Sequence, residues 1–335
     1  MKKLISMLMV TALMGVSLML SACAAGNTSS EVIRVGGLKG PTSMGLLYLK
    51  EAADVTSGDE QSSDDYKITM TNVLNNYEFT MATAADELLP LIIKGELDIA
   101  LVPTNVAAIL YNKTEGNIAV IDVNTLGVLS IVTADPSISS IADLKGKTIY
   151  LTGKGTTPEY SLRYVLEENG LTDSDVIFEF RSEPTEVASI LASDENAIGL
   201  LPQPFVTAAC MQNDKLRIAV KLSDEWEDMV TGVTIVRKDF LEKNPDAVAK
   251  FIEEHKDSVV NINLDPEHGA KLAVESSIVA KEPIALKAIP ECNIVCIDGS
   301  AMKDMVSSYL EVLFDKDPSS VGGKLPGEDF YFVEN

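Results

Sequence analysis

Residues 94–105 read KGELDIALVPTN, and this short stretch decides the fold class. Gly95 ends the helical apolar pattern of residues 88–94, and residues 98–102 form an apolar run typical of a buried strand. Pro103-Thr104-Asn105 then begins another helix, which runs to about residue 112. Helix, strand and helix in so short a segment are typical of an α/β protein.

The same alternation continues in both directions. Further strands are expected at residues 33–36, 67–74, 118–123, 128–133, 148–151, 176–180, 197–201 and 231–237. Further helices are expected to begin at Pro41, at Thr156 with a capping box to Glu159, and at residue 187. After residue 237 the chain becomes mainly helical, with helices expected at 244–260, from 265 onward, and at 300–314.

The composition is that of an acidic globular protein. The chain has 335 residues, 46% of them hydrophobic, and 50 acidic side chains against 27 basic ones give a formal net charge of −23. This length predicts two domains or one two-lobed protein. The composition excludes a disordered or fibrous chain, and the acidic balance argues against nucleic acid as a partner.

The N-terminus has the pattern of a bacterial export signal. Lys2 and Lys3 precede an apolar run over residues 4–20, which meets Leu-Ser-Ala-Cys at residues 20–23. This ending resembles a lipobox, so we expect a signal peptide at 1–22, lipid on the Cys23 thiol and a short tether at 23–30. Removal of residues 1–22 with their two lysines would change the net charge from −23 to −25. The alternative is a single membrane anchor, for which the interrupted run is at the short limit.

Three cysteines remain after the tether: Cys210, Cys292 and Cys296. The odd number argues against a disulfide framework. If residues 293–295 form a strand, the Cα atoms of Cys292 and Cys296 lie roughly 13 Å apart, which is too far for a disulfide. A zinc site is not expected either, because the spacing does not fit and no histidine is close by. We therefore expect buried free thiols and no metal.

Three expected strand ends lead onto a helix N-terminus through small, polar or proline residues. They are residues 39–44, 103–105 and 154–159. Exposed N–H groups at such turns could bind an anionic or hydrogen-bonding ligand, and ligands of open α/β sheets lie outside the carboxyl ends of the strands. Plain helix capping explains any one of these turns, but their recurrence favours a binding site.

Several motifs carry a resemblance to one known family. They are GLKGPTSMG at 37–45, KGELDIA at 94–100, VPTN at 102–105, DLKGK at 143–147 and VRKDFLEKNP at 236–245. Together with the lipobox, they resemble the substrate-binding lipoproteins of ABC importers, in the group that contains nitrate, sulfonate and taurine receptors and thiamine-precursor binders. The resemblance covers nearly the whole chain after the tether and is specific for the family rather than for the ligand.

The resemblance implies a two-lobed periplasmic-binding-protein fold of type II, in which two strands cross between α/β lobes and the ligand lies between them. The crossings are expected near residues 128–133 and 231–236. Lobe one would then comprise 31–131, lobe two 132–231, and a mostly helical return to lobe one 232–335. Closure around the ligand would be a hinge motion.

The family's ligand pocket can be carried over onto turns of both lobes. Two lysines lie in these turns, Lys39 in the first lobe and Lys154 in the second. They are either solvated or, if they face the cleft, they favour an anionic solute. At residue 203 a glutamine replaces an acid found in relatives, which argues against a cationic ligand group there. The expected ligand-binding residues are Lys39, Thr42, Ser43, Met44, Thr104, Asn105, Asn124, Thr125, Gly155, Thr156, Thr157 and Gln203.

The function implied is that of a monomeric, lipid-anchored, extracytoplasmic substrate-binding subunit of an ABC importer. Its partners would be a small solute, ABC permease subunits and the membrane, and it would have no catalysis and no cofactor. One alternative is a ligand-sensing lipoprotein for a signalling partner. Another is a thiamine-pyrimidine-related protein on the same fold, although the cysteine-rich motif and reactive histidine of those synthases are missing here.

Two short motifs resemble a phosphate-binding loop and a nucleophile elbow, but neither fits in detail. Gly146-Lys147-Thr148 echoes a phosphate loop but enters a strand, and Pro41 stands where a nucleophile elbow needs glycine. His255 and His268 lie in polar stretches and are expected at the surface. Acidic pairs such as Asp64-Asp65 and Glu253-Glu254 are interpreted as solvated faces.

The charge of the solute is the most open point. Lys39, Lys154 and three helix N-termini could make the cleft locally positive in an acidic protein, which favours an anionic solute such as a sulfonate or carboxylate. An uncharged heterocycle would instead need aromatic walls, for which the candidates are Tyr160, Tyr77 and Phe205.

Overall fold

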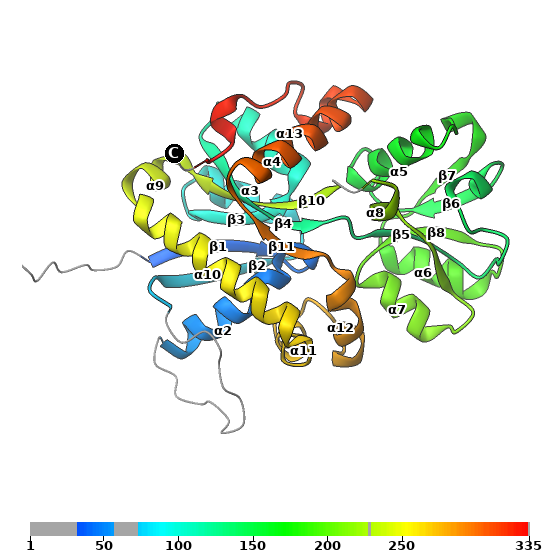
Figure 1. The fold of residues 1–335 in the computed structure, drawn as a ribbon, viewed down its shortest axis with the longest axis horizontal. Coiled ribbons are helices and arrows are strands. Elements are labelled where there is room, and N and C mark those ends of the chain that lie inside the picture. Colours follow the sequence, from blue (N-terminus) through cyan, green and yellow to red (C-terminus); the bar gives the residue numbers. More distant parts are fainter. Residues whose placement is uncertain (1–31, 57–72, 227–228, 334–335) are drawn as a thin grey trace, which may run out of the picture. The chain divides into compact units, whose positions relative to one another are not determined.

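The structure is a computed structural model that describes residues 32–56, 73–226 and 229–333 (Figure 1). The expected signal peptide at 1–22, the expected lipidation site Cys23 and the tether at 23–30 lie outside the described residues, as does most of the strand expected at 67–74. Within the described ranges, no helix combines the length and the apolar character needed to cross a bilayer.

Two separate sheets form the centres of two lobes (Figure 1). In the described part of the chain, the first sheet has the strand order β11-β4-β10-β3-β1-β2 and the second has the order β7-β6-β8-β5-β9. The strands of the first sheet are β1 (Val32–Leu38), β2 (Asn76–Ala82), β3 (Ile99–Pro103), β4 (Ile118–Leu126), β10 (Val230–Arg237) and β11 (Ile294–Ile297). The strands of the second sheet are β5 (Leu129–Thr133), β6 (Thr148–Leu151), β7 (Ile177–Phe180), β8 (Ile198–Pro202) and β9 (Arg217–Lys221).

Helices follow most strands and cover both sheets. Around the first sheet lie η1 (Pro41–Leu46), α2 (Leu47–Thr56), α3 (Ala85–Ile93), α4 (Thr104–Lys113), α9 (Lys238–Lys243), α10 (Pro245–Leu264), α11 (Pro266–Glu275), α12 (Glu282–Ala288), η4 (Ile289–Glu291), α13 (Gly299–Lys316), η5 (Pro318–Val321) and η6 (Glu328–Phe330). The second lobe contains η2 (Ile141–Leu144), α5 (Thr157–Glu168), η3 (Asp173–Asp175), α6 (Pro184–Ser193), α7 (Phe205–Gln212) and α8 (Leu222–Glu225). Strand–helix alternation around mixed sheets confirms the expected α/β class.

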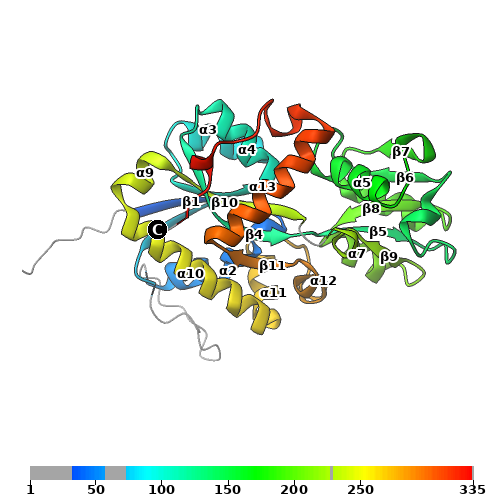
Figure 2. The same ribbon diagram turned by 45° about the horizontal axis from the view of Figure 1, so that its top comes forward.

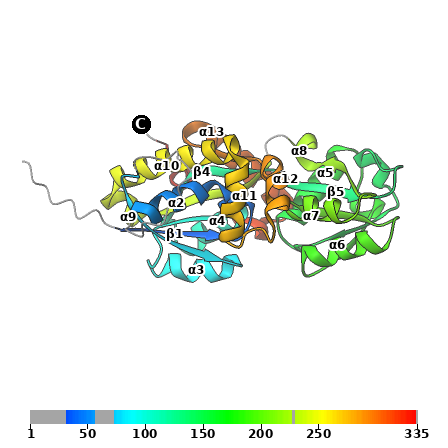
Figure 3. The same cartoon turned by 90° about the horizontal axis from the view of Figure 1, so that it is seen from below.

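The helices form layers on the two faces of the first sheet. Figure 3 shows α2 and α10 on one side of β1 and α3 on the other. Figure 2 shows α13 running from the first lobe towards α5 of the second, and the two helices are in contact. The C-terminal third of the chain therefore completes the first lobe and also touches the second.

The chain passes between the sheets twice. It leaves the first sheet at the end of β4 and enters the second at β5, and it returns between β9 and β10. Strands β4 and β10 are antiparallel neighbours, so the outgoing and returning segments start from adjacent positions in the first sheet. The lobe boundaries expected at 131/132 and 231/232 stay a prediction.

A buried ion-pair node ties three strands of the first sheet together. Asp98, at 2% exposure, immediately precedes β3. Its Oδ2 accepts hydrogen bonds from the backbone N (3.0 Å) and Nε (2.8 Å) of Arg34 in β1. Its Oδ1 accepts from Nη2 of Arg34 (2.6 Å) and Nη2 of Arg237 in β10 (2.9 Å). Burial raises the pKa of Asp98, but the hydrogen bonds from Arg34 and Arg237 outweigh burial and hold the pKa below its ordinary value.

Some expected elements differ in the structure. The strand that pairs with β1 is β2, beyond the expected strand at 67–74, and β4 continues through residues 124–126, where a turn was expected. The elements α7, β9, α9 and α12 were not expected. The predicted capping box is wrong: Thr156 Oγ1 donates to Gly153 O (2.6 Å), and Glu159 accepts from Gly155 N (2.6 Å) while also binding Arg163.

Both histidines are buried, which contradicts the expected surface location. His255 has 0% exposure and His268 has 8%. Glu254, expected on a solvated face, is also buried and accepts a hydrogen bond from the Tyr77 hydroxyl. For His255 and Glu254 the reason is the orientation of α10, whose inner face packs them beside Phe251 and Ile262. His268 belongs to α11, and its Nε2 lies 2.9 Å from both carboxylate oxygens of Glu51.

Candidate functional site

A cavity of about 400 Å³ lies where turns of both lobes meet. This volume is within the range of small-molecule sites. The first lobe contributes the turn after β1, the β3–α4 turn and one residue each from β10 and the end of β2. The second contributes the start of β5, the end of β8 and the start of α5. The lining residues are Leu38, Lys39, Gly40, Pro41, Thr42, Thr83, Pro103, Asn105, Val106, Val128, Leu129, Thr156, Thr157, Pro158, Pro202 and Thr231.

Part of the expected ligand set is brought together in this cavity. Five of the expected residues line it: Lys39, Thr42, Asn105, Thr156 and Thr157. Each of them lies at or next to a strand-to-helix turn, which is where parallel strands present their carboxyl ends.

The remaining expected residues do not line the cavity. Ser43, Met44, Thr104, Asn124 and Thr125 are buried, and Gly155 is exposed outside the lining. Thr104 Oγ1 donates to Val230 O (2.9 Å), and Asn124 Nδ2 donates to Thr234 Oγ1 (3.3 Å). Gln203 is buried and accepts a hydrogen bond from the Thr207 hydroxyl (2.8 Å), beside a separate cavity of about 150 Å³ near the crossing. The five buried residues Ser43, Met44, Thr104, Asn124 and Thr125 therefore face the protein interior.

One hydrogen bond joins the lobes across the cavity wall. Thr157 Oγ1, at the start of α5, donates to Asn105 Oδ1 in the first turn of α4 over 3.1 Å. The two N-terminal helix ends therefore meet at the same place. Each carries roughly half a positive charge, so the backbone at this point favours an anion.

Two hydroxyl oxygens at the cavity have no hydrogen-bond partner within the described residues. They are Thr42 Oγ1 and Thr231 Oγ1, and both atoms are buried. Thr42 as a residue is 5% exposed. An unpaired buried hydroxyl costs free energy. Because both oxygen atoms are buried, a ligand would accept these hydrogens only after the side chains rotate towards the cavity.

The two candidate lysines have different surroundings. Lys39 is exposed, lines the cavity, and has no carboxylate within ion-pair distance in the described ranges. Lys154 does not line the cavity, because its ammonium lies over the Phe180 ring, 5.6 Å from the centroid. Of the two lysines, Lys39 is the one that adds positive charge to the cavity.

The candidate aromatic residues do not line the cavity. The Tyr160 hydroxyl donates to Asp317 (2.7 Å), and burial followed by this contact raises the pKa of Tyr160 to about 12. Tyr77 is bound to Glu254, and Phe205 borders a different cavity of about 640 Å³. The walls of the cavity are therefore aliphatic and proline-rich rather than aromatic.

A second contact between the lobes lies along α13. Trp226, which follows α8, stacks on Tyr309 of α13 with ring centroids 5.0 Å apart, and its other neighbour is Tyr164 of α5 at 4.2 Å. Lys316 forms an ion pair with Glu167 close by. The aromatic group of Tyr164, Trp226 and Tyr309 thus joins helices that belong to different sheets.

Comparison with known proteins agrees with this architecture. Residues 116–268 match the family model described as NMT1/THI5 like. The matched residues run from β4 in the first lobe, through the second lobe, to β10, α10 and the start of α11 in the first lobe. It confirms the family resemblance recognised in the sequence motifs.

Relatives and solved structures extend the comparison. A protein of Brucella abortus (strain 2308), named provisionally as a binding protein, is 25% identical over 181 residues; the alignment covers 53% of this chain and 56% of the relative. The alignment thus spans little more than half of the curated relatives that it matches. An ABC transporter structure from Parabacteroides distasonis has a TM-score of 0.73 at 24% identity, covering 91% of this chain and 99% of that one.

Two further structures carry ligand names. The periplasmic aliphatic sulphonate binding protein SsuA of Escherichia coli has a TM-score of 0.70 at 15% identity, covering 90% of this chain and 96% of that one. The periplasmic nitrate-binding protein NrtA of Synechocystis PCC 6803 has a TM-score of 0.58 at 11% identity, covering 86% and 82%. At these identities the likeness establishes the fold, and the two-lobed type II architecture is confirmed.

Proposed function

We propose that this protein is the substrate-binding subunit of an ABC importer and that it holds a small anionic organic solute between its lobes. The observation that carries the proposal is the cavity lining. The protein has 50 acidic side chains, yet within the described part of the chain no aspartate or glutamate lines this cavity, whereas Lys39 does.

Electrostatics supports an anion at this position. A formal net charge of −23 repels anions at long range, so binding needs a locally positive cleft. Lys39 supplies a full charge, and the N-termini of α4 and α5 add partial ones. The hydroxyls of Thr42 and Thr231 have no partner among the described residues and would donate to anion oxygens after rotating towards the cavity. The aliphatic walls suit the carbon skeleton of a sulfonate or carboxylate.

A ligand screen tests the proposal. We expect aliphatic sulfonates or carboxylates to raise the unfolding temperature of the purified protein, because a ligand that binds only the folded state stabilises it. Thiamine precursors and flavins serve as uncharged or aromatic competitors, and nitrate serves as an inorganic anion. Stabilisation by the heterocycles alone would contradict the anionic assignment.

We further propose binding without turnover. Among the residues that the structure describes, the cavity lining has no histidine, cysteine or carboxylate that could act as nucleophile or general base. The solute should be recovered unchanged after incubation with the protein, and small-angle scattering should show a smaller radius of gyration in its presence. Chemical conversion of the solute would contradict this part of the proposal.

The proposed location is the extracytoplasmic face of the cell membrane, with the protein held by lipid on Cys23. The support is the sequence pattern of residues 1–23. We expect Cys23→Ala either to release the protein from the membrane fraction or to leave the precursor uncleaved. The measurement is membrane fractionation with intact mass, and Cys210→Ala is the control. An unchanged mass and unchanged membrane retention in Cys23→Ala would contradict the assignment.

A further inference from the structure

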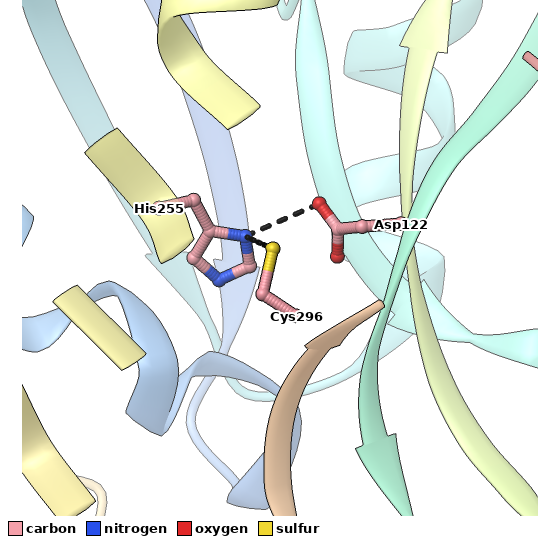
Figure 4. A group of neighbouring side chains, drawn as sticks. All are labelled: Asp122, His255 and Cys296. Atoms are coloured by element: carbon pink, nitrogen blue, oxygen red, sulfur yellow. Dashed lines mark hydrogen bonds and ion pairs between the residues drawn. The ribbon is translucent and has the colours of Figure 1, made fainter. Parts of the chain in front are cut away.

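Three side chains able to ligate a metal meet where α10 packs against β11, the strand that neighbours β4 (Figure 4). They are Asp122 of β4, His255 of α10 and Cys296 of β11, and their ligand atoms all lie within 4.8 Å of one another. His255 Nδ1 lies 3.2 Å from Asp122 Oδ2 and 3.8 Å from Cys296 Sγ. One imidazole nitrogen therefore faces both an oxygen and a sulfur.

Burial makes the charge of this cluster important. Asp122 and His255 are both 0% exposed, and Cys296 is partly buried. Asp122 Oδ1 accepts a hydrogen bond from the Thr234 hydroxyl (2.7 Å), but among the described residues no lysine or arginine forms an ion pair with Asp122. Lys256, the next residue along α10, is bound to Asp298 (3.0 Å). Among the described residues the basic partner of Asp122 is the imidazole of His255. A buried carboxylate is costly unless that imidazole or a metal ion supplies positive charge.

The surroundings of Cys296 disfavour a negative charge on its sulfur. Burial, followed by the Asp122 carboxylate, raises the pKa of Cys296. Burial therefore favours the neutral thiol over the thiolate when no metal is bound. A divalent cation reverses this preference, because a coordinating thiol loses its proton.

We propose that Asp122, His255 and Cys296 bind one zinc ion through a carboxylate oxygen, Nδ1 and Sγ. Zinc takes this mixture of donors in tetrahedral geometry at about 2.0–2.3 Å. Two ligands of such an ion stand roughly 3.3–3.6 Å apart, close to the observed 3.2 and 3.8 Å. The carboxylate and the thiolate neutralise the two charges of the ion, and water completes the fourth position.

The proton balance is simple. Binding breaks the S–H bond of Cys296 and releases that proton to solvent, while a sulfur–zinc bond forms. The imidazole keeps one proton, which resides on Nε2 because Nδ1 holds the metal. His255 Nε2 faces Gly45 of η1, away from the other two ligands.

The zinc ion cross-links three elements of the first lobe. It joins β4, which leads directly to the second lobe, to α10 and β11, which belong to the returning part of the chain. None of the three ligands lines the solute cavity. Zinc binding is therefore independent of solute binding, and the two proposals can fail separately.

Cobalt substitution tests the site. The protein carrying Cys23→Ala, stripped of metal by chelation, is titrated with Co²⁺ and then with Zn²⁺. We expect one equivalent of Co²⁺ to produce tetrahedral ligand-field bands and a sulfur-to-cobalt charge-transfer band. Zinc should displace cobalt and raise the unfolding temperature.

Two cysteine variants locate the sulfur ligand. Cys296→Ser should abolish the sulfur band and weaken zinc binding by roughly 100-fold or more, because loss of even an outer-shell partner costs about 10–100-fold. Cys210→Ser, which alters a partly buried thiol in α7 of the other lobe, should change neither. A sulfur band that survives in Cys296→Ser overturns the proposal. So does the absence of any sulfur band in the parent protein, a result that does not depend on whether the variant folds.

Discussion

Replacing Lys39 with glutamate is expected to weaken solute binding by at least about 3 kcal/mol, roughly 100-fold or more. The substitution removes the positive side chain of the cavity lining and puts a carboxylate in its place. Lys39→Ala, which only removes the charge, should cost about 1.5–3 kcal/mol if the ammonium binds the anion directly. Isothermal titration with a solute found in the screen measures both.

Lys154 provides a matched control for charge reversal. It is a loop lysine of the second lobe, but its ammonium stacks on Phe180 outside the cavity. Lys154→Glu should change the affinity by much less, and the affinity of the parent protein should fall as salt is added, because Lys39 is exposed. Equal effects of the two substitutions, with no salt dependence, would contradict an anion bound at Lys39.

Asp98→Asn is expected to lower the free energy of unfolding by about 3 kcal/mol. The substitution preserves the shape of the side chain but removes the buried negative charge, and Arg237, which is 13% exposed, is left with the more exposed carboxylate of Asp239 as its counterion. The value is at the lower end of the range for removal of one partner of a buried pair, because Arg34 is 37% exposed and can turn to water. Urea denaturation followed by far-ultraviolet circular dichroism measures the loss.

The same carboxylate predicts a pH dependence with a definite sign. The pKa of Asp98 is lower in the folded protein than in the unfolded chain. Its contribution to stability is therefore complete above the unfolded value of about 3.9 and is lost as the pH falls through the folded value. Glu195→Gln, which removes one partner of an exposed pair with Lys215, is the control and should cost no more than about 0.5 kcal/mol. Similar losses in the free energy of unfolding from both variants would contradict a large contribution of the buried Asp98 ion pairs.

Local patterns in the sequence were sufficient for most of the fold and for the turns of the site. The strand at 98–102 and the helix that begins at Pro103-Thr104-Asn105 depend on short-range signals, and the structure has both. Lys39, Thr42 and Asn105 lie at such turns, so their place in one cavity follows from the parallel order of β1 and β3.

What could not be predicted depends on which way a side chain faces. Ser43 and Met44 follow Thr42 directly but turn into the interior, because the rotation of the short helix η1 decides which residue meets the cavity. For β2, the alternation of Tyr77, Phe79 and Met81 carried a usable signal.

The burial of His255 could have been predicted from helical periodicity, but the polar composition around it pointed to the surface. The stretch around residues 253–258 is strongly polar, yet Phe251, His255, Ser258 and Ile262 recur at helical spacing and form the inner face of α10. Its approach to Cys296 joins residues 41 positions apart. That approach depends on the packing of α10 against β11, which no local pattern contains.

The aromatic group of Tyr164, Trp226 and Tyr309 gives this protein an intrinsic fluorescent probe. Trp226 is the single tryptophan of the chain, so the whole of its indole emission originates at one point between a helix of each lobe. Any rotation of one lobe against the other changes what the indole ring touches. The proposed closure of the lobes on the solute can therefore be tested in real time by the wavelength and intensity of this fluorescence, without attaching a dye.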